Sequence, residues 1–266
     1  MTGSPGPPPG PPPSYAFGDS AVASRRLEVL ARVFGPTSMA LLRDLAPGRG
    51  RVVLDLGCGP GHTTAMLASL FPAAEVVGID SSAAFVAEAT ATAAPRCRFE
   101  VADVTGASLP GAPADLIYGR FLLVHLPQPG AALATWTGQL EPGGVLVVEE
   151  PESIETDDGD FARYLELASI VVAGRGGDLY AGRFLTDARP PSGTVILRRR
   201  TPLDVPVGLA ATIFSLNLAT WGDDPAVAEV AGPAERSGLA ARLERRGADA
   251  ATGVIRWWMR QLVVRR

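Results

Sequence analysis

The chain has 266 residues, of which 47% are hydrophobic and 20% are charged. This length fits one large α/β domain, or a core of about 150 residues with a smaller lid, and the composition excludes a disordered polymer. The net charge of −4, from 28 acidic and 24 basic residues, disfavours a surface that binds nucleic acid over its whole extent. The 2 cysteines, Cys58 and Cys97, exclude a disulfide framework and a cysteine zinc site.

The N-terminal region combines a tail with a helical segment. Residues 1–13 hold 7 prolines and 3 glycines and predict a disordered Pro/Gly tail. Within residues 14–50, apolar residues recur at helical spacing over 20–45. We expect Pro36 to divide this stretch into two helices, because proline lacks the N–H that a helix interior needs. Pro47-Gly48 is expected to end the second helix.

Residues 51–150 alternate short apolar segments with helical ones. Because the strands of a parallel sheet are buried on both faces, they read as continuous apolar runs. The alternation therefore predicts an α/β fold with a Rossmann-like, doubly wound, mostly parallel sheet, whose ligands bind at the carboxyl ends of the strands. The expected strands are 52–54, 75–79, 97–101, 115–118 and 145–148, the expected helices are 63–70, 82–93 and 131–140, and a turn is expected at 141–144.

Residues 151–266 are expected to finish the sheet and to build a helical lid over the substrate. The periodicity is looser here, and Gly and Pro are frequent. The expected helices are 160–173, 208–221 and 227–246, and the expected strands are 195–203 and 254–264.

A glycine-rich turn follows the first expected strand. Gly57, Gly59 and Gly61 have the spacing G-x-G-x-G, and glycines let a backbone approach a ligand closely. A dinucleotide fingerprint would need a glycine at position 62, where the chain has His62. Asp55 precedes the turn, and its carboxylate suits a ligand with a cationic amino group better than a pyrophosphate.

Further motifs follow in order. Asp80 ends the second strand, where a carboxylate can accept both ribose hydroxyls, and Asp103 follows the third strand. Residues 118–127 read Tyr-Gly-Arg-Phe-Leu-Leu-Val-His-Leu-Pro, and Leu-Glu-Pro-Gly-Gly at 140–144 precedes the fifth strand. In this order, the motifs over about residues 50–150 resemble the class I S-adenosylmethionine-dependent methyltransferases that act on small molecules.

This resemblance implies a cofactor, S-adenosyl-L-methionine, and its product, S-adenosyl-L-homocysteine. The glycine turn would cradle the methionine part, with Asp55 supporting the turn or the amino group. Asp80 would hold the ribose and Asp103 the adenine, and an aromatic residue of the leading segment would close over the cofactor. The residues to which the resemblance gives a cofactor-binding role are Tyr15, Arg26, Asp55, Gly57, Gly59, Gly61, Asp80, Asp103, Arg120 and Phe121.

Two residues are catalytic candidates on the acceptor side. His125 follows the fourth strand and is placed to act as a base, although a histidine in its His-Leu-Pro context can also be structural. Glu149 and Glu150 end the fifth strand, and one of them, with Glu150 as the candidate, is expected to face the cleft. The acidic residues between 152 and 160 could bind magnesium, but a solvated loop and a helix cap explain them equally, and no metal is expected.

The acceptor is expected to be a small aromatic metabolite, methylated at a carbon such as an indole carbon or at an oxygen. Phe214, Trp221 and either Asn217 or Leu218 share one face of the expected helix, which suits a flat hydrophobic molecule, although core packing explains them equally well. Neither nucleic acid nor membrane is an expected partner, and the arginine run 198–200 fits an exposed strand edge. The oligomeric state, a homodimer included, stays open.

The chain is expected to be cytoplasmic, because it shows neither a signal peptide nor an apolar run of about 18 residues. Two alternatives to a methyltransferase stay open: a non-catalytic module with the same fold, and a nicotinamide-dependent oxidoreductase. All 24 basic residues are arginines, so an oxidoreductase could not use a Tyr-x-x-x-Lys pair. A non-catalytic module would be expected to lack Asp80 or a glycine of the turn.

Overall fold

The computed structural model describes residues 17–45, 51–248 and 252–266. Within these ranges seven strands form one sheet in the order β3-β2-β1-β4-β5-β7-β6. Strands β1 to β5 are parallel to one another, whereas β7 runs antiparallel to both β5 and β6. The strands are β1 Val52–Leu56, β2 Glu75–Asp80, β3 Cys97–Val101, β4 Ala114–Arg120, β5 Leu140–Glu155, β6 Thr194–Pro206 and β7 Val254–Arg265.

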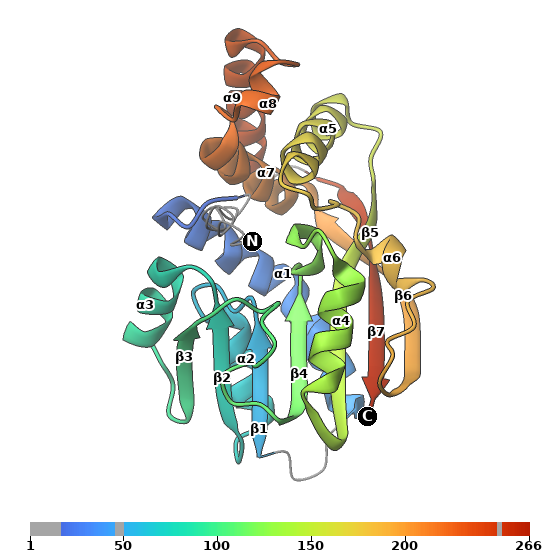
Figure 1. The fold of residues 1–266 in the computed structure, drawn as a ribbon. Coiled ribbons are helices and arrows are strands. Elements are labelled where there is room, and N and C mark those ends of the chain that lie inside the picture. The colour runs from blue at the N-terminus through green and yellow to red at the C-terminus, as the bar shows by residue number, and fades with distance from the viewer. Residues whose placement is uncertain (1–16, 46–50, 249–251) are drawn as a thin grey trace, which may run out of the picture.

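Helices cover both faces of this sheet, as Figure 1 shows, with α4 in front and α1 and α2 behind. Leu42 of α1 and Leu67 of α2 pack in one apolar cluster with strand residues, and Trp136 of α4 packs in another. The sheet is therefore doubly wound, as predicted. The helices are α1 Ala21–Leu45, α2 His62–Leu70, α3 Ala83–Ala91, α4 Pro129–Gly138, α5 Gly159–Gly174, α6 Gly182–Leu185, α7 Val207–Trp221, α8 Pro225–Ala228 and α9 Pro233–Ala248.

The expected break at Pro36 is wrong, because α1 is one helix that contains this proline. Proline removes one hydrogen bond from a helix interior. Phe34, on one side of Pro36, is buried in an apolar cluster with residues of α5 and α7, and Leu41 and Leu42 on the other side are buried against the sheet. Packing at both ends thus holds the helix together across the missing bond.

Two further boundaries differ from the prediction. The expected helix 227–246 is divided into α8 and α9, because Pro233 starts a new helix. The expected turn at 141–144 lies within β5, where the pairing partner moves from Leu140 to Val145 while β4 advances only from Ala114 to Leu116. The extra residues form a bulge, and β5 then continues through Pro151 to Glu155.

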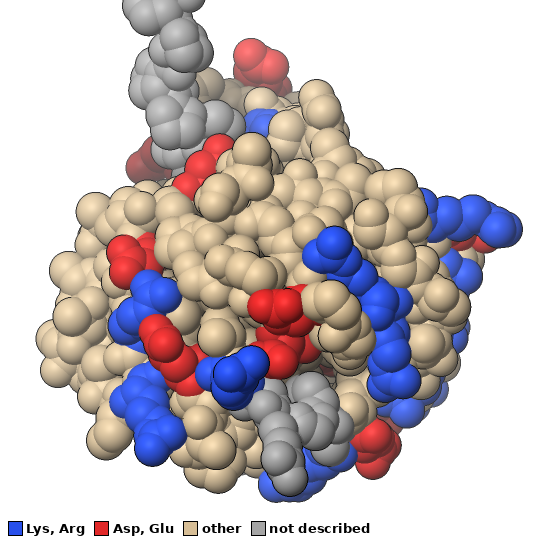
Figure 2. Space-filling model, turned by 60° about the horizontal axis from the view of Figure 1, so that its bottom comes forward, with Lys and Arg blue, Asp and Glu red and all other residues tan. Residues whose placement is uncertain are grey.

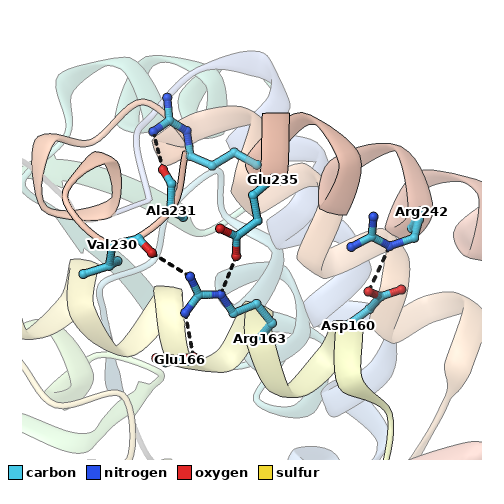
Figure 3. Close-up of polar contacts among 8 residues, drawn as sticks. Asp160, Arg163, Glu166, Val230, Ala231, Glu235 and Arg242 are labelled. Atoms are coloured by element: carbon cyan, nitrogen blue, oxygen red, sulfur yellow. Dashed lines mark hydrogen bonds and ion pairs between the residues drawn. The ribbon is translucent and has the colours of Figure 1, made fainter. Parts of the chain in front are cut away.

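A helical lid lies above the carboxyl ends of the parallel strands, built from α5, α7, α8 and α9 (Figure 1). Its interior is a cluster of buried apolar residues that includes Phe161 of α5, Phe214 of α7 and Leu239 of α9. Ion pairs join the outer surfaces of α5 and α9: Arg163 contacts Glu235, and Arg242 contacts Asp160 (Figure 3). The lid is thus a packed unit rather than a loose loop.

The opposite end of the molecule carries acidic and basic side chains that are interspersed over its surface (Figure 2). The arginine run 198–200 lies on β6, the edge strand, as predicted. None of the described helices is long and apolar enough to cross a membrane. The predicted tail 1–13, Tyr15 and the Pro47-Gly48 stop lie outside the described residues.

Candidate active site

A cavity of about 790 Å³ lies between the carboxyl ends of the strands and the helical lid. One half is lined by the turns that follow β1, β2 and β3, including Gly57, Asp80 and Asp103. The other half is lined by α1, by the segment after β4 and by lid residues such as Tyr164 and Phe214. We call these two parts the strand half and the lid half.

The glycine turn takes a backbone shape that favours glycine. Gly57, Gly59 and Gly61 have φ values of +66°, +53° and +89°, in the left-handed region that other residues rarely adopt. A Cβ on Gly57 would stand 2.9 Å from Cδ1 of Leu122. Gly57 and Gly59 line the cavity, so the backbone itself faces a ligand there, whereas Gly61 is not among the lining residues.

Asp55, in β1 just before the glycine turn, contacts the helix that follows the turn. Its Oδ2 accepts hydrogen bonds from the hydroxyl groups of Thr63 at 2.7 Å and Thr64 at 2.6 Å, both in the first turn of α2. The side chain is buried, and burial raises its pKa to about 6. Asp55 also lines the cavity. These contacts tie the end of β1 to the start of α2, and the role of Asp55 toward a cofactor stays a prediction.

Asp80 connects two neighbouring turns. One oxygen accepts the N–H of Gly59 at 2.9 Å, and the other accepts the N–H of Ser82 at 2.8 Å. Burial raises the pKa of this carboxyl group. The backbone N–H of Ser81 also favours the charged form of this carboxyl group, and the side chain lines the strand half of the cavity.

Asp103 lies further along the same wall. Its Oδ1 accepts hydrogen bonds from the N–H of Thr105 at 2.8 Å and from the hydroxyl of Thr105 at 2.7 Å. The three carboxylates Asp55, Asp80 and Asp103 all line the strand half.

Arg120 and Phe121 lie at the junction of the two halves and line the cavity. Nη1 of Arg120 donates to the Ser38 hydroxyl on α1 at 3.0 Å. Phe121 has a φ of +55°, which is strained for a bulky residue, and its ring stands edge-on to Phe34 with centroids 4.8 Å apart. The phenyl ring packs against the apolar cluster of the lid and lines the cavity.

His125 lines the lid half of the cavity. Its ring meets Phe17 edge-on at a centroid distance of 5.4 Å. Burial, together with the positive charges of Arg26 and Arg175, lowers its pKa to about 3. The imidazole is therefore neutral near pH 7 and can accept or donate a hydrogen bond.

Glu149 and Glu150 do not line the cavity, contrary to the expectation that one of them faces it. Glu149 accepts hydrogen bonds from the Tyr118 hydroxyl at 2.7 Å and from Nε2 of Gln261 at 2.6 Å. Glu150 accepts the N–H groups of Leu122 and Leu123, each at 2.8 Å. Both carboxyl groups thus hold the sheet and the turn after β4 in place.

Several cavity residues had no signal in the sequence, among them Arg175, Tyr164 and Trp257. They reach the cavity through the packing of the lid on the sheet. His62 directly follows the glycine turn, at the start of α2, and lines the cavity. Burial lowers its pKa.

The acidic residues near α5 have structural partners. Asp158 caps α5 by accepting the N–H groups of Asp160 and Phe161, and it also pairs with Arg246. Within the described ranges no group of three or more metal-ligating side chains comes together.

Similarity to known proteins identifies the domain that carries the strand half of the cavity. Residues 53–144 match the family described as "Methyltransferase domain". The chain carries a class I S-adenosylmethionine-dependent methyltransferase domain. The matched part runs from β1 into the bulge of β5 and contains the glycine turn, Asp80, Asp103 and His125.

Two curated relatives carry the name trans-aconitate 2-methyltransferase. The protein of Methylobacterium radiotolerans is 39% identical over 133 residues, which are 50% of this chain and 50% of the relative. The protein of Deinococcus radiodurans is 40% identical over 139 residues, 46% of this chain and 53% of the relative. The chain thus matches only about half the length of these relatives.

The fold is also that of solved methyltransferases. A coclaurine N-methyltransferase bound to N-methylheliamine and SAH has a TM-score of 0.54 and 16% identity. The match covers 87% of this chain and 72% of that enzyme. It extends the likeness beyond the methyltransferase domain, into the part of the chain that includes the lid.

Proposed function

We propose that this protein is an S-adenosylmethionine-dependent methyltransferase that acts on a small molecule. The observation that carries the proposal is the strand half of the cavity, where the glycine turn, Asp80 and Asp103 follow three adjacent strands. The left-handed glycine backbone leaves room for a ligand to lie against the chain. When bound, the cofactor supplies a methyl group on a sulfonium, which an acceptor atom can displace in line.

The residues present fit that cofactor. Asp80 lines the strand half, where its carboxylate oxygens can accept hydrogen bonds from the ribose hydroxyls. Asp103 lies one strand further out, where it accepts a hydrogen bond from the adenine amino group. The Gly57–Gly61 turn and Asp55 hold the methionine part, and Arg120 and Phe121 line the space beside the sulfur. Tyr15 and Arg26 stay candidates for closing the cofactor site.

The acceptor binds in the lid half, under residues of the 151–266 segment. Phe121, Tyr164, Phe214 and Trp257 line this half and fit a flat aromatic molecule better than a flexible polymer. Catalysis rests mainly on holding the acceptor atom and the methyl group in line. His125 is the base where an acceptor carbon or hydroxyl must lose a proton.

A crystal structure grown with S-adenosylhomocysteine tests this assignment. We expect the ribose hydroxyls within hydrogen-bond distance of Asp80 and the adenine beside Asp103. A cofactor bound with its adenine under the lid would contradict the proposed roles.

A turnover assay separates an enzyme from a non-catalytic module. The chain is incubated with methyl-labelled S-adenosylmethionine and a panel of phenols, indoles and small carboxylic acids. We expect label in at least one organic product. A chain that binds the cofactor but labels no member of the panel would favour the module.

A further inference from the structure

Arg120 is a half-buried cation that lines the cavity together with Asp55. Its positive charge opposes the rise that burial gives to the pKa of Asp55. Among the described residues no acidic side chain forms an ion pair with Arg120. Its Nη1 donates to the Ser38 hydroxyl at 3.0 Å, which is neutral and does not balance the charge.

The register of the sheet places an acidic residue directly beside this arginine. Arg120 of β4 is the partner of Glu149 on β5, and an arginine beside a carboxylate normally forms charge-assisted hydrogen bonds with it. Glu149 instead accepts hydrogen bonds from the Tyr118 hydroxyl at 2.7 Å and from Nε2 of Gln261 at 2.6 Å. Two neutral donors therefore hold the buried carboxylate in place of the neighbouring guanidinium.

Tyr118 is well suited to hold Glu149 in this way. It is fully buried and stands two positions before Arg120 on β4, so both side chains belong to the same face of the sheet. Burial and the charge of Glu149 raise the pKa of its hydroxyl well above the usual value. The hydroxyl therefore stays protonated and donates its hydrogen bond at any physiological pH.

Ser38 of α1 completes a buried polar chain. Its hydroxyl donates to the carbonyl oxygen of Phe34 at 3.2 Å, accepts from Nη1 of Arg120 and also contacts the Tyr118 hydroxyl. Ser38, Tyr118 and Glu149 are all buried, and none of these three described residues lines the cavity. The chain reaches the cavity only at the guanidinium of Arg120.

The cofactor requires that such a cation be held in one place. S-Adenosylmethionine carries a carboxylate on its amino-acid part and a positive charge on its sulfonium, a few bonds away. A guanidinium is favourable beside the carboxylate and unfavourable beside the sulfonium. Its fixed position therefore decides whether it helps or hinders binding.

We propose that Ser38, Tyr118 and Glu149 position Arg120 to bind the carboxylate of the cofactor's amino-acid part. Tyr118 engages Glu149 and so prevents an ion pair that would draw the guanidinium away from the cavity. Ser38 holds the guanidinium by its Nη1. The inference rests on the proposed methyltransferase function and goes beyond it by giving a role to three residues that do not touch the cofactor.

Two ligands measure the contact with the amino-acid part. S-Adenosylhomocysteine and methylthioadenosine share the adenine, the ribose and a thioether, but only the first has the amino acid. The ratio of their dissociation constants, here the preference for S-adenosylhomocysteine, isolates what the amino acid contributes. Arg120→Gln should reduce this preference by about tenfold, because a charge-assisted hydrogen bond is lost.

Variants of the chain separate positioning from folding. Tyr118→Phe frees Glu149 to pair with Arg120, so the preference should fall almost as far as in Arg120→Gln. Adding Glu149→Gln to Tyr118→Phe removes the competing charge and should restore most of the preference. A loss of stability alone would weaken both ligands alike and would not be rescued by a second substitution.

Ser38→Ala should reduce the preference by about threefold, and it serves as the test if Tyr118→Phe does not fold. Thr137→Val is the matched control. Thr137 is also buried in a helix, and its hydroxyl donates to the carbonyl of Leu133 at 2.8 Å, but it lies on α4. The control should leave the preference unchanged.

The proposal is overturned if Arg120→Gln keeps the preference, or if both Tyr118→Phe and Ser38→Ala keep it. A double variant with a preference as low as that of Tyr118→Phe would overturn it as well, because the competing ion pair would then have no effect. A wild-type chain that binds neither ligand would instead refute the proposed function, so the two failures are distinguishable.

Discussion

The carboxyl group of Glu150 accepts the backbone N–H of Leu122 at 2.8 Å, which ties the end of β5 to the turn that follows β4. The same oxygen accepts the N–H of Leu123, while the other oxygen is buried without a hydrogen-bond partner among the described residues. This turn carries Phe121 and leads into the short helical segment Leu123–His125. Glu150 therefore positions residues that line the cavity without lining it itself.

Glu150→Ala should destabilise the fold by roughly 1–3 kcal/mol, because two backbone N–H groups lose their acceptor. Glu150→Gln should cost less, since its amide oxygen can accept the same two bonds. The free energies of unfolding in urea measure both effects. Equal losses in the two variants would show that the ionisable carboxyl group, rather than an oxygen acceptor at this place, is what the turn requires.

The same residue predicts a pH dependence of stability. Burial raises the pKa of Glu150 to about 8 from the usual 4.5. Between these values the folded chain holds a proton that the unfolded chain has released, so its stability falls as the pH rises. Relative to Glu150→Gln, wild type should lose up to about 1.4 kcal/mol per pH unit across this window. Parallel stability curves for the two proteins would contradict the raised pKa.

Asp80→Ala should weaken binding of S-adenosylhomocysteine by roughly 1–3 kcal/mol, because the ribose hydroxyls lose a charged acceptor. Asp115→Ala is the matched control. Asp115 also accepts two backbone N–H groups, from Arg51 and Val52, but at the opposite end of β1. The control should lower stability and leave affinity unchanged. If Asp80→Ala binds as tightly as this control, Asp80 is not the ribose ligand.

His125→Ala should lower kcat by about 10²–10⁴-fold where the acceptor must lose a proton, with little change in cofactor affinity. Its pKa of about 3 keeps the imidazole neutral near pH 7, which is the form that can accept a proton. Melting temperature and kcat are measured on one preparation. A destabilised variant that turns over normally would make His125 a structural residue.

The sequence was sufficient to predict the parallel sheet and the strand half of the cavity. Its strands are continuous apolar runs, and Asp55, Asp80 and Asp103 stand at fixed places relative to them, so local pattern determines position. Glu150 could not be placed in this way, because a carboxylate at a strand end faces either a cavity or a neighbouring turn, and the partner N–H groups belong to another element.

The lid half depends on contacts between residues far apart in the chain. Arg175 reaches the cavity because α5 packs on the rest of the lid, and its ion pair with Asp224 joins two helices. Pro36 does not break α1 for a similar reason, since the buried residues on both sides of it outweigh one lost hydrogen bond. The periodicity of apolar residues along the chain predicts neither the position of Arg175 at the cavity nor the packing on both sides of Pro36.

The central claim is most directly tested by calorimetry of the full chain with S-adenosylmethionine, S-adenosylhomocysteine and a nicotinamide dinucleotide. We predict micromolar binding of the first two ligands, about −8 kcal/mol, and no heat with the dinucleotide. Binding of the dinucleotide without heat from either S-adenosyl compound would contradict the assignment.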